Sequence, residues 1–531
     1  MTMHTVRTAL ALAAAVVLAS CSREEPVAYD VVEKSLSQIS DDLAAGKVTS
    51  VALTNAYIAR INAHDGSFRS VIAIAPDAMK QAEASDARRK DGKAIGPLDG
   101  VPILLKDNID WQGMPTTAGS WALEQNMPAR DSEVGRRLRA AGIVMLGKTN
   151  LDQYAGMRTI NYINASTVGG GVNNPYRPGL SACGSSSGSG IAGAVSFAAG
   201  TVGTETSGSV VCPASMNGLV GIKPSIALVS RRGVVPISLT QDTTGPMTRT
   251  VRDLAMMLTV MAGSDAEDRW SADADAHKTD YVTVLDANAL KGARLGVVRG
   301  VAGSTPATDA VLDKALDVMR GQGAEVVEVP ISMFEDLTQE QRIILLYDFK
   351  EDINAYLAST PPSVKSRTLS DLIAFHTSDP RESMHAIDIF ELSEKLEGGR
   401  QNPEYIKVLE YAKRRAGAEG IDRALSEYQV RALVSLTNGP AEAHPKEGTR
   451  MPFYPLTEYP KGSVPPDMTT YTSVAGYPNL SVPMGLVDGL PVGISFSGAM
   501  WSEADLIRLG YAYEQASKAR VPPAPLQTAR P

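Results

Sequence analysis

The chain has 531 residues, of which 44% are apolar and 21% are charged. It is therefore long enough to bury a large core, and it is not a disordered chain, a collagen-like fibre or a disulfide-stapled miniprotein. The 51 basic residues are outnumbered by 59 acidic ones, which gives a net charge of −8 at pH 7. Since the sequence also contains no block of lysine and arginine, we expect no nucleic-acid partner.

The first 20 residues have the pattern of an export signal. Arg7 lies near the amino terminus, and the apolar run over residues 9–18 is too short to span a bilayer. This run ends in LASC, which resembles a bacterial lipobox, so we expect Cys21 to be lipidated. A plain secretory signal with an incidental cysteine is the alternative. The expected product is an exported protein, lipid-anchored at the periplasmic face of a bacterial membrane, with residues 21–29 as its tether.

The rest of the chain alternates between helical and strand periodicity. In chain order, the pattern predicts helices over residues 31–44, 50–64 and 76–90, a strand over 100–105, a helix over 133–141, a strand over 143–146, a strand–helix–strand unit over 293–298, 307–320 and 324–329, strands over 433–436, 479–482 and 492–496, and a closing helix over 503–518. Ser50 is the predicted N-cap of its helix. Alternation of this kind is typical of an α/β fold.

Two regions differ from this pattern. Residues 169–221 are rich in Gly, Ser and Ala, but apolar residues recur among them, which indicates tightly packed backbone and not a flexible linker. Residues 335–430 are polar and mostly helical in pattern, and we expect them to shape the substrate side of the protein. Without any repeat of 20 to 50 residues, we predict a single domain over 30–520 and a C-terminal tail over 521–531.

Cys183 and Cys212 are the two cysteines that remain beyond Cys21. An oxidising compartment would permit a disulfide between them, and two small buried thiols are the alternative. Neither belongs to a CxxC pair, and the six histidines are too scattered for a short metal-binding signature. We expect no metal and no cofactor.

Two motifs match known patterns in an unsuitable setting. Residues 142–149 (GIVMLGKT) fit the phosphate-loop pattern GxxxxGK[ST], but their four variable positions are themselves a predicted strand. Residues 184–188 (GSSSG) fit GxSxG, the nucleophile elbow of α/β-hydrolases, which would make Ser186 a nucleophile. That elbow follows an apolar strand, whereas residues 174–183 predict a loop. Neither motif is the favoured site.

A stronger candidate site combines a lysine with two groups of hydroxyls. Lys106 ends an apolar strand, where burial can lower its pKa enough for it to act as a base. Serines 185 and 186 could relay a proton from a nucleophile to this base. The turn over residues 206–209 consists of small residues, so its backbone amides could face a developing oxyanion. Each serine taken alone is as readily explained as a capping hydroxyl.

These residues lie in motifs that resemble the successive signature blocks of the amidase signature family. The blocks are GVPILLKD at 100–107, CGSSSGS at 183–189, GTETSGSVVCP at 203–213, GLVGIKP at 218–224, DTTGPMTR at 242–249, and YPNLSVPMG with DGLPVG within 477–493. They occur in the family's order between about residue 30 and about residue 520. The resemblance implies an α/β fold with one large mixed sheet whose two faces are covered by helices.

The resemblance also implies a role for each site residue. Ser209 would be the nucleophile, Ser185 a bridging serine that follows a cis peptide bond, and Lys106 the base. The backbone amides of the oxyanion hole would be those of Thr206, Ser207, Gly208 and Ser209. Attack on an amide carbonyl would give an acyl-enzyme on Ser209, which water would hydrolyse to a carboxylic acid.

Within the family, the sequence is most similar to bacterial peptide amidases, which remove the C-terminal amide of peptides. Ser187 and Glu205 follow this subgroup, whereas Ser207 departs from it. We therefore expect hydrolysis of linear amides, with peptide C-terminal amides as substrates and no obligate protein partner. The alternatives are an aryl acylamidase or another amide or ester hydrolase of the family, a catalytically inactive binding lipoprotein, and the catalytic component of an amidotransferase, which the export signal disfavours.

Overall fold

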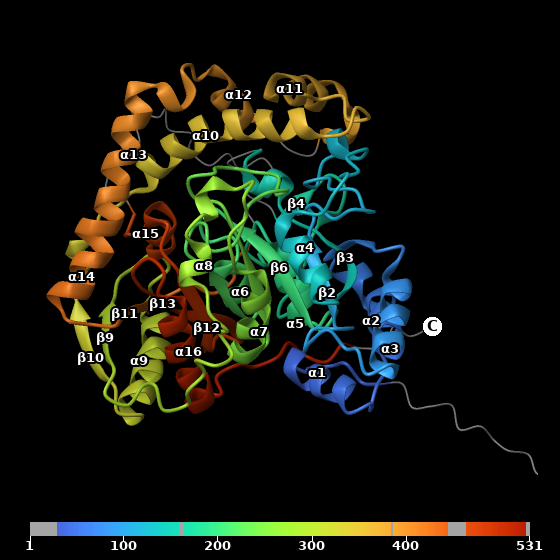
Figure 1. The fold of residues 1–531 in the computed structure, drawn as a ribbon. Helices are drawn as coiled ribbons and strands as arrows, with labels where there is room; N and C mark the ends of the chain where they lie inside the picture. The colour runs from blue at the N-terminus through green and yellow to red at the C-terminus, as the bar shows by residue number, and fades with distance from the viewer. Residues whose placement is uncertain (1–28, 159–163, 384–385, 444–463, 527–531) are drawn as a thin grey trace, which may run out of the picture.

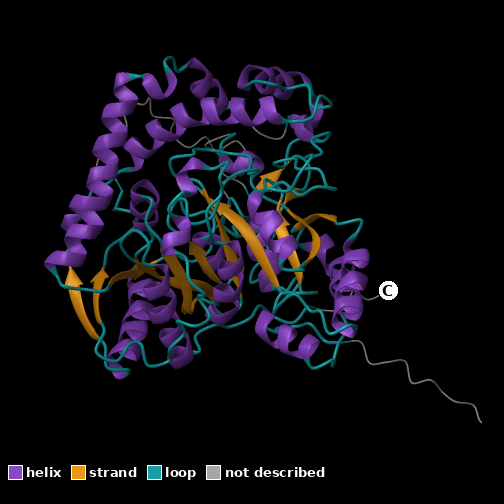
Figure 2. Ribbon diagram, viewed as in Figure 1, coloured by secondary structure: helices purple, strands orange, loops and turns teal. Residues whose placement is uncertain are grey.

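The computed structural model of the chain describes residues 29–158, 164–383, 386–443 and 464–526 (Figure 1). An eleven-stranded sheet crosses the molecule, in the order β1-β3-β2-β6-β8-β7-β12-β13-β11-β9-β10. Helices cover both of its faces (Figure 2). The predicted fold class, a large mixed sheet between helices, is confirmed.

The sheet combines two parallel groups with antiparallel strands between them. Its strands are β1 (Val71–Ile74), β2 (Pro102–Lys106), β3 (Val144–Thr149), β6 (Gly200–Glu205), β7 (Val220–Lys223), β8 (Thr243–Thr248), β9 (Arg294–Val298), β10 (Glu325–Val329), β11 (Ala432–Leu436), β12 (Asn479–Val487) and β13 (Leu490–Ser497). Strands β3, β2 and β6 are parallel, as are β11, β9 and β10. Because β2 and β6 are parallel neighbours, Lys106 and Glu205, the last residues of these strands, lie at the same edge of the sheet.

The helices agree closely with the predicted ones. They include α1 (Leu36–Ala44), α2 (Ser50–His64), α3 (Ala78–Lys90), α4 (Glu133–Ala140), α5 (Ser187–Ala194), α6 (Val211–Met216), α7 (Val251–Met261), α8 (Ala274–His277), α9 (Pro306–Gly321), α10 (Thr338–Ser359), α11 (Leu369–Ser378), α12 (Asp388–Lys395), α13 (Pro403–Ala416), α14 (Asp422–Glu427), α15 (Met468–Ala475) and α16 (Glu503–Ser517). Helix α1 begins later than predicted because Ser35 forms a capping box with Gln38.

The predicted N-cap at Ser50 is wrong by one residue. Thr49 has the extended backbone of an N-cap, and its hydroxyl accepts a hydrogen bond from Ala52 N. Ser50 is the first helical residue, and its hydroxyl donates to Gly100 O at 2.8 Å. Both residues can cap a helix, so the choice depends on this contact with a distant loop.

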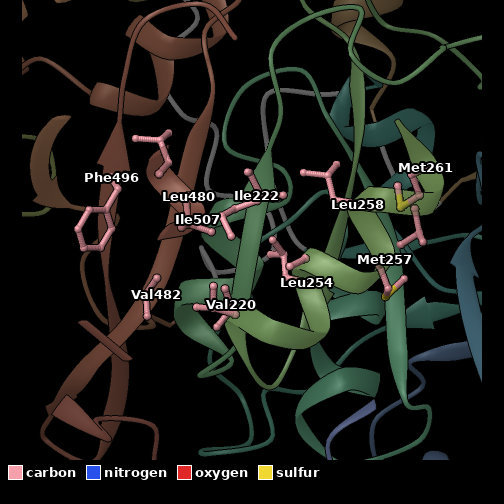
Figure 3. Packing of buried hydrophobic residues seen from close by; sticks show 14 of the residues in the cluster. Val220, Ile222, Leu254, Met257, Leu258, Met261, Leu480, Val482, Phe496 and Ile507 are labelled. Carbon is pink, nitrogen blue, oxygen red and sulfur yellow. The ribbon is translucent and has the colours of Figure 1, made fainter. Parts of the chain in front are cut away.

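The sheet core is formed by apolar side chains from strands and helices that are far apart in the sequence. Figure 3 shows Ile222 of β7 and Leu480 of β12 near Leu254 of α7 and Ile507 of α16. All four side chains are fully buried. This packing joins the N-terminal and C-terminal halves of the chain into one core.

Helices α10 to α14 form an arch along the top and left of the view in Figure 1, beside the end of the sheet where β6 terminates. A buried ion pair attaches this arch to the loops after β3. Arg158 Nη1 donates to Glu382 Oε2 at 2.6 Å, and Ser120 Oγ donates to Glu382 Oε1 at 2.7 Å. Arg158 and Glu382 are each at most 1% exposed. The arch is therefore held to the core by paired charges as well as by apolar contacts.

The expected signal over residues 1–20, Cys21 and most of the tether lie outside the described residues. Among the residues that are described, no helix combines the length and the apolar character required to cross a membrane. The tail over 521–526 has no regular secondary structure.

Candidate active site

Lys106 lies at the centre of the candidate site, at the end of β2, with its side chain fully buried. Its Nζ is 2.7 Å from Ser185 Oγ, 2.8 Å from Thr204 Oγ1 and 3.4 Å from Thr204 O. Burial lowers the pKa of Lys106 to about 7, although the charges of Asp152, Asp242 and Glu205 oppose this shift. A large fraction of Lys106 is therefore neutral near pH 7 and can accept a proton.

Ser185 lies between β5 and α5, in the loop that brings it to Lys106. The peptide bond between Gly184 and Ser185 is cis, as the family resemblance implied. Asp152 N donates to Ser185 O at 3.1 Å, and Ser186 N donates to Ser209 O at 3.3 Å. These two backbone hydrogen bonds connect the loop to the end of β3 on one side and to the Ser209 turn on the other.

Ser209 lies in the tight turn between β6 and α6, and it is 7% exposed. The carboxylate of Glu205, the last residue of β6, binds this turn from inside. Its oxygens accept from Gly208 N at 3.0 Å, Val210 N at 2.7 Å and Val211 N at 2.9 Å. Glu205 therefore fixes the backbone on both sides of Ser209.

The predicted set of oxyanion-hole amides needs one correction. The amide of Gly208 donates to Glu205 Oε1, and Gly208 has a positive φ of 77°, which suits glycine. Among the described residues, the amides of Thr206, Ser207 and Ser209 have no hydrogen-bond acceptor. These three amides are the ones available to bind an oxyanion.

Asp242 holds the other end of the same turn. Its Oδ1 accepts from Thr206 Oγ1 at 2.5 Å, and its Oδ2 accepts from Ile237 N at 2.8 Å and Ser238 N at 2.9 Å. Burial raises the pKa of Asp242 to about 7. Ser238 Oγ also donates to Asp348 of α10 at 2.6 Å, so hydrogen bonds connect the helical arch to the Ser209 turn.

A disulfide joins the two segments that carry the serines. Cys183 lies two residues before Ser185, Cys212 lies three residues after Ser209, and the Cα atoms of the two cysteines are 5.9 Å apart. The question that the sequence left open is thus answered in favour of pairing. The bond attaches the Ser185 loop to the first turn of α6.

Both unsuitable motifs prove to be structural. Residues 144–149 of the phosphate-loop pattern are strand β3, and Lys148 Nζ donates to Ile109 O at 2.7 Å in the interior. Ser186 Oγ donates to Thr204 O at 3.1 Å and accepts from Thr204 N at 3.3 Å. The hydroxyl of Ser186 therefore attaches its loop to β6.

Thr204, Asn108 and Asp242 are site residues to which the sequence gave no individual role. Thr204 and Asn108 lie 96 positions apart, yet Asn108 Nδ2 donates to Thr204 Oγ1 at 3.0 Å. Their only signal in the sequence is their position in or beside the family motifs. In the described part of the chain, no cluster of three or more His, Cys, Asp or Glu residues could hold a metal ion.

The fold and this site are those of an amidase, and the chain belongs to the amidase family. The family, described as Amidase, matches residues 52–507. The chain is 40% identical to the native peptide amidase from Stenotrophomonas maltophilia, with a TM-score of 0.84 over 92% of this chain and 98% of that one. It is also 35% identical to a putative amidase of Arthroderma benhamiae, over 93% of this chain and 88% of the relative. A similarity of 34% extends to one component of the glutamyl-tRNA(Gln) amidotransferase of Chloroflexus aurantiacus, over 90% and 95% of the two chains. The protein is therefore an enzyme of the amidase family.

Proposed function

We propose that the enzyme hydrolyses linear carboxylic amides through Lys106, Ser185 and Ser209. The observation that carries this proposal is the 2.7 Å contact between Lys106 Nζ and Ser185 Oγ, in a site where the lysine is fully buried. A neutral amine in this position can remove the proton of a hydroxyl, whereas an ammonium cannot. The turn with Ser209 is bonded to the same loop through Ser186 N.

The chemistry follows from this order of groups. Ser209 Oγ forms a bond to the amide carbon while its proton passes to Ser185 Oγ, and the proton of Ser185 passes to Lys106 Nζ. The carbonyl oxygen becomes an oxyanion, which the amides of Thr206, Ser207 and Ser209 stabilise. Lys106 returns its proton through Ser185 to the leaving nitrogen, so that the C–N bond breaks. Water then attacks the acyl group on Ser209 by the same relay, releasing a carboxylic acid.

We further propose C-terminal amides of peptides as the substrates. Support comes from the peptide amidases among the similar structures, one of them in complex with the competitive inhibitor chymostatin, at 41% identity over 92% of this chain. The likeness to a bacterial aryl acylamidase is 24%, which supports a common fold alone. The half-buried Ser207 lies beside the proposed oxyanion site, where a change of side chain can alter the choice of substrate.

The experiment uses peptides that differ only at the C-terminus, one amidated and one a free acid, together with an aryl anilide and a simple ester. We expect ammonia release from the amidated peptide, with its internal bonds intact by mass spectrometry. The rate should rise with pH through about 7, because Lys106 must lose its proton. Turnover of the anilide or ester alone would refute the peptide substrate, and a rate that is flat down to pH 5 would refute a lysine base.

The export and lipidation of the enzyme at Cys21 remain our proposal. The disulfide between Cys183 and Cys212 supports an oxidising compartment, since disulfides are rare in the cytosol. Globomycin, an inhibitor of lipoprotein signal peptidase, should make the unprocessed precursor accumulate in cells. If processing continues unchanged in its presence, Cys21 is not a lipidation site.

A further inference from the structure

The amine of Lys106 has more partners than the proposed proton relay uses. Besides Ser185 Oγ, it contacts Thr204 Oγ1 at 2.8 Å and Thr204 O at 3.4 Å. A neutral primary amine has two N–H bonds and one lone pair. It can therefore donate to two of these three oxygens, and its lone pair is left for the third.

Thr204 is held in place independently of Lys106. It belongs to β6, which pairs with β2 in parallel, and its backbone is bonded to Ser186 Oγ through both N and O. Its hydroxyl oxygen also accepts from Asn108 Nδ2 at 3.0 Å. The donor groups of Asn108 and Lys106 together occupy both lone pairs of this oxygen. Thr204 thus presents fixed acceptors to the amine.

We propose that Thr204 is a positioning residue for the base: its hydroxyl and carbonyl oxygens take the two amine hydrogens of Lys106, so that the lone pair points at Ser185 Oγ. The proposal rests on the proposed function, because it assigns Lys106 the role of base. It adds that correct proton transfer depends on a threonine that never contacts the substrate. Asn108 supports this arrangement by fixing the orientation of the Thr204 hydroxyl.

Thr204→Val tests the proposal, since it removes the hydroxyl with little change of shape. We expect kcat to fall by about 10- to 100-fold while KM changes little, because the base is misdirected. The hydroxyl also stabilises the charged form of Lys106, so its loss lowers the pKa of the lysine. The acid limb of the kcat/KM profile should therefore move to lower pH, by about one unit. Thr204→Ser should restore most of the activity.

Thr244→Val is the matched control. Thr244 lies opposite Thr204 in the antiparallel pair of β6 and β8, so both side chains are on the same face of the sheet. It is fully buried, and its hydroxyl has no hydrogen-bond partner among the described residues. The same substitution there removes a hydroxyl without removing a contact to Lys106. We expect kcat within about twofold of the wild type and an unchanged acid limb.

Asn108→Asp changes the pH profile in the opposite direction. The acidic groups that face Lys106 from its neighbouring elements are Asp152, Asp242 and Glu205. A fourth carboxylate at position 108 favours the charged lysine, so the acid limb should move to higher pH. The proposal is overturned if Thr204→Val loses no more activity than Thr244→Val, or if its acid limb does not move. If the wild type hydrolyses no amide at all, the proposed function itself fails, which is a separate outcome.

Discussion

Glu205→Gln tests how the nucleophile turn is held. The three amides that Glu205 binds belong to Gly208, Val210 and Val211, on both sides of Ser209. The carboxylate is fully buried, and the ammonium of Lys223 in β7 is the charged group that favours its ionised form. Glutamine keeps the length of the side chain but replaces one acceptor oxygen with an NH₂ group.

The cost of this replacement can be worked out from the contacts. Oε2 serves Val210 and Val211, while Oε1 serves Gly208, so a single amide oxygen leaves at least one buried N–H without an acceptor. A buried unsatisfied donor and a lost charge-assisted bond together cost about 2 to 4 kcal/mol. With an unfolding entropy of about 2.1 cal/mol/K per residue, a unit of about 490 residues loses about 1 °C of Tm per kcal/mol. We expect Tm to fall by about 2 to 4 °C.

Activity should suffer as well, because the misplaced group is the attacking oxygen. We expect kcat on an amidated peptide to fall by about 10- to 100-fold. Tm is measured by differential scanning fluorimetry and kcat by ammonia release. Glu83→Gln, at an exposed position of α3, makes the same chemical change without these contacts, and Glu205→Asp keeps both oxygens. A Glu205→Gln enzyme that matches the Glu83→Gln control in Tm and kcat would refute this account of the turn.

Three further predictions concern the groups around the site. Removing the disulfide with Cys183→Ala and Cys212→Ala should cost about 3 to 4 kcal/mol, because the bond closes a loop with a sequence separation of 29; an unchanged Tm, with and without reductant, would contradict this. Asp242→Asn mimics the protonated acid, whose pKa is raised to about 7 by burial, so the deficit in kcat/KM should be small at pH 6 and larger at pH 8.5. A deficit that is the same at both pH values would show that the charge on Asp242 does not hold Thr206. Glu382→Gln should lower Tm by about 3 to 5 °C, since it leaves the guanidinium of the arch clamp without its buried carboxylate; a loss below 1 °C would show that the clamp contributes little.

The periodic helices and the apolar strands could be predicted from the sequence. Helix α2, for example, has the predicted bounds, because its apolar residues recur at helical spacing and Thr49 can cap it. Strands β6, β7 and β8 could not be predicted as strands. They are buried on both faces and contain many small residues, so they lack the alternation that identifies a half-exposed strand.

The candidate site was predictable as a set of residues but not as a set of contacts. Lys106, Ser185 and Ser209 follow from the family motifs, whereas the bond between Thr204 and Asn108 joins residues that are distant in the sequence. The engagement of the Gly208 amide by Glu205 is also invisible in the sequence, because it depends on the φ of one turn. Hydrogen bonds of this kind require the order of the strands in the sheet, which a single sequence does not contain.

The identity of the nucleophile is the central claim, and one measurement tests it most directly. The enzyme is treated with a serine-directed fluorophosphonate, digested and mapped by mass spectrometry. The account predicts a single adduct on Ser209, which is lost in Ser209→Ala and strongly reduced in Lys106→Ala. An adduct on Ser186, or labelling that persists in Ser209→Ala, would contradict it.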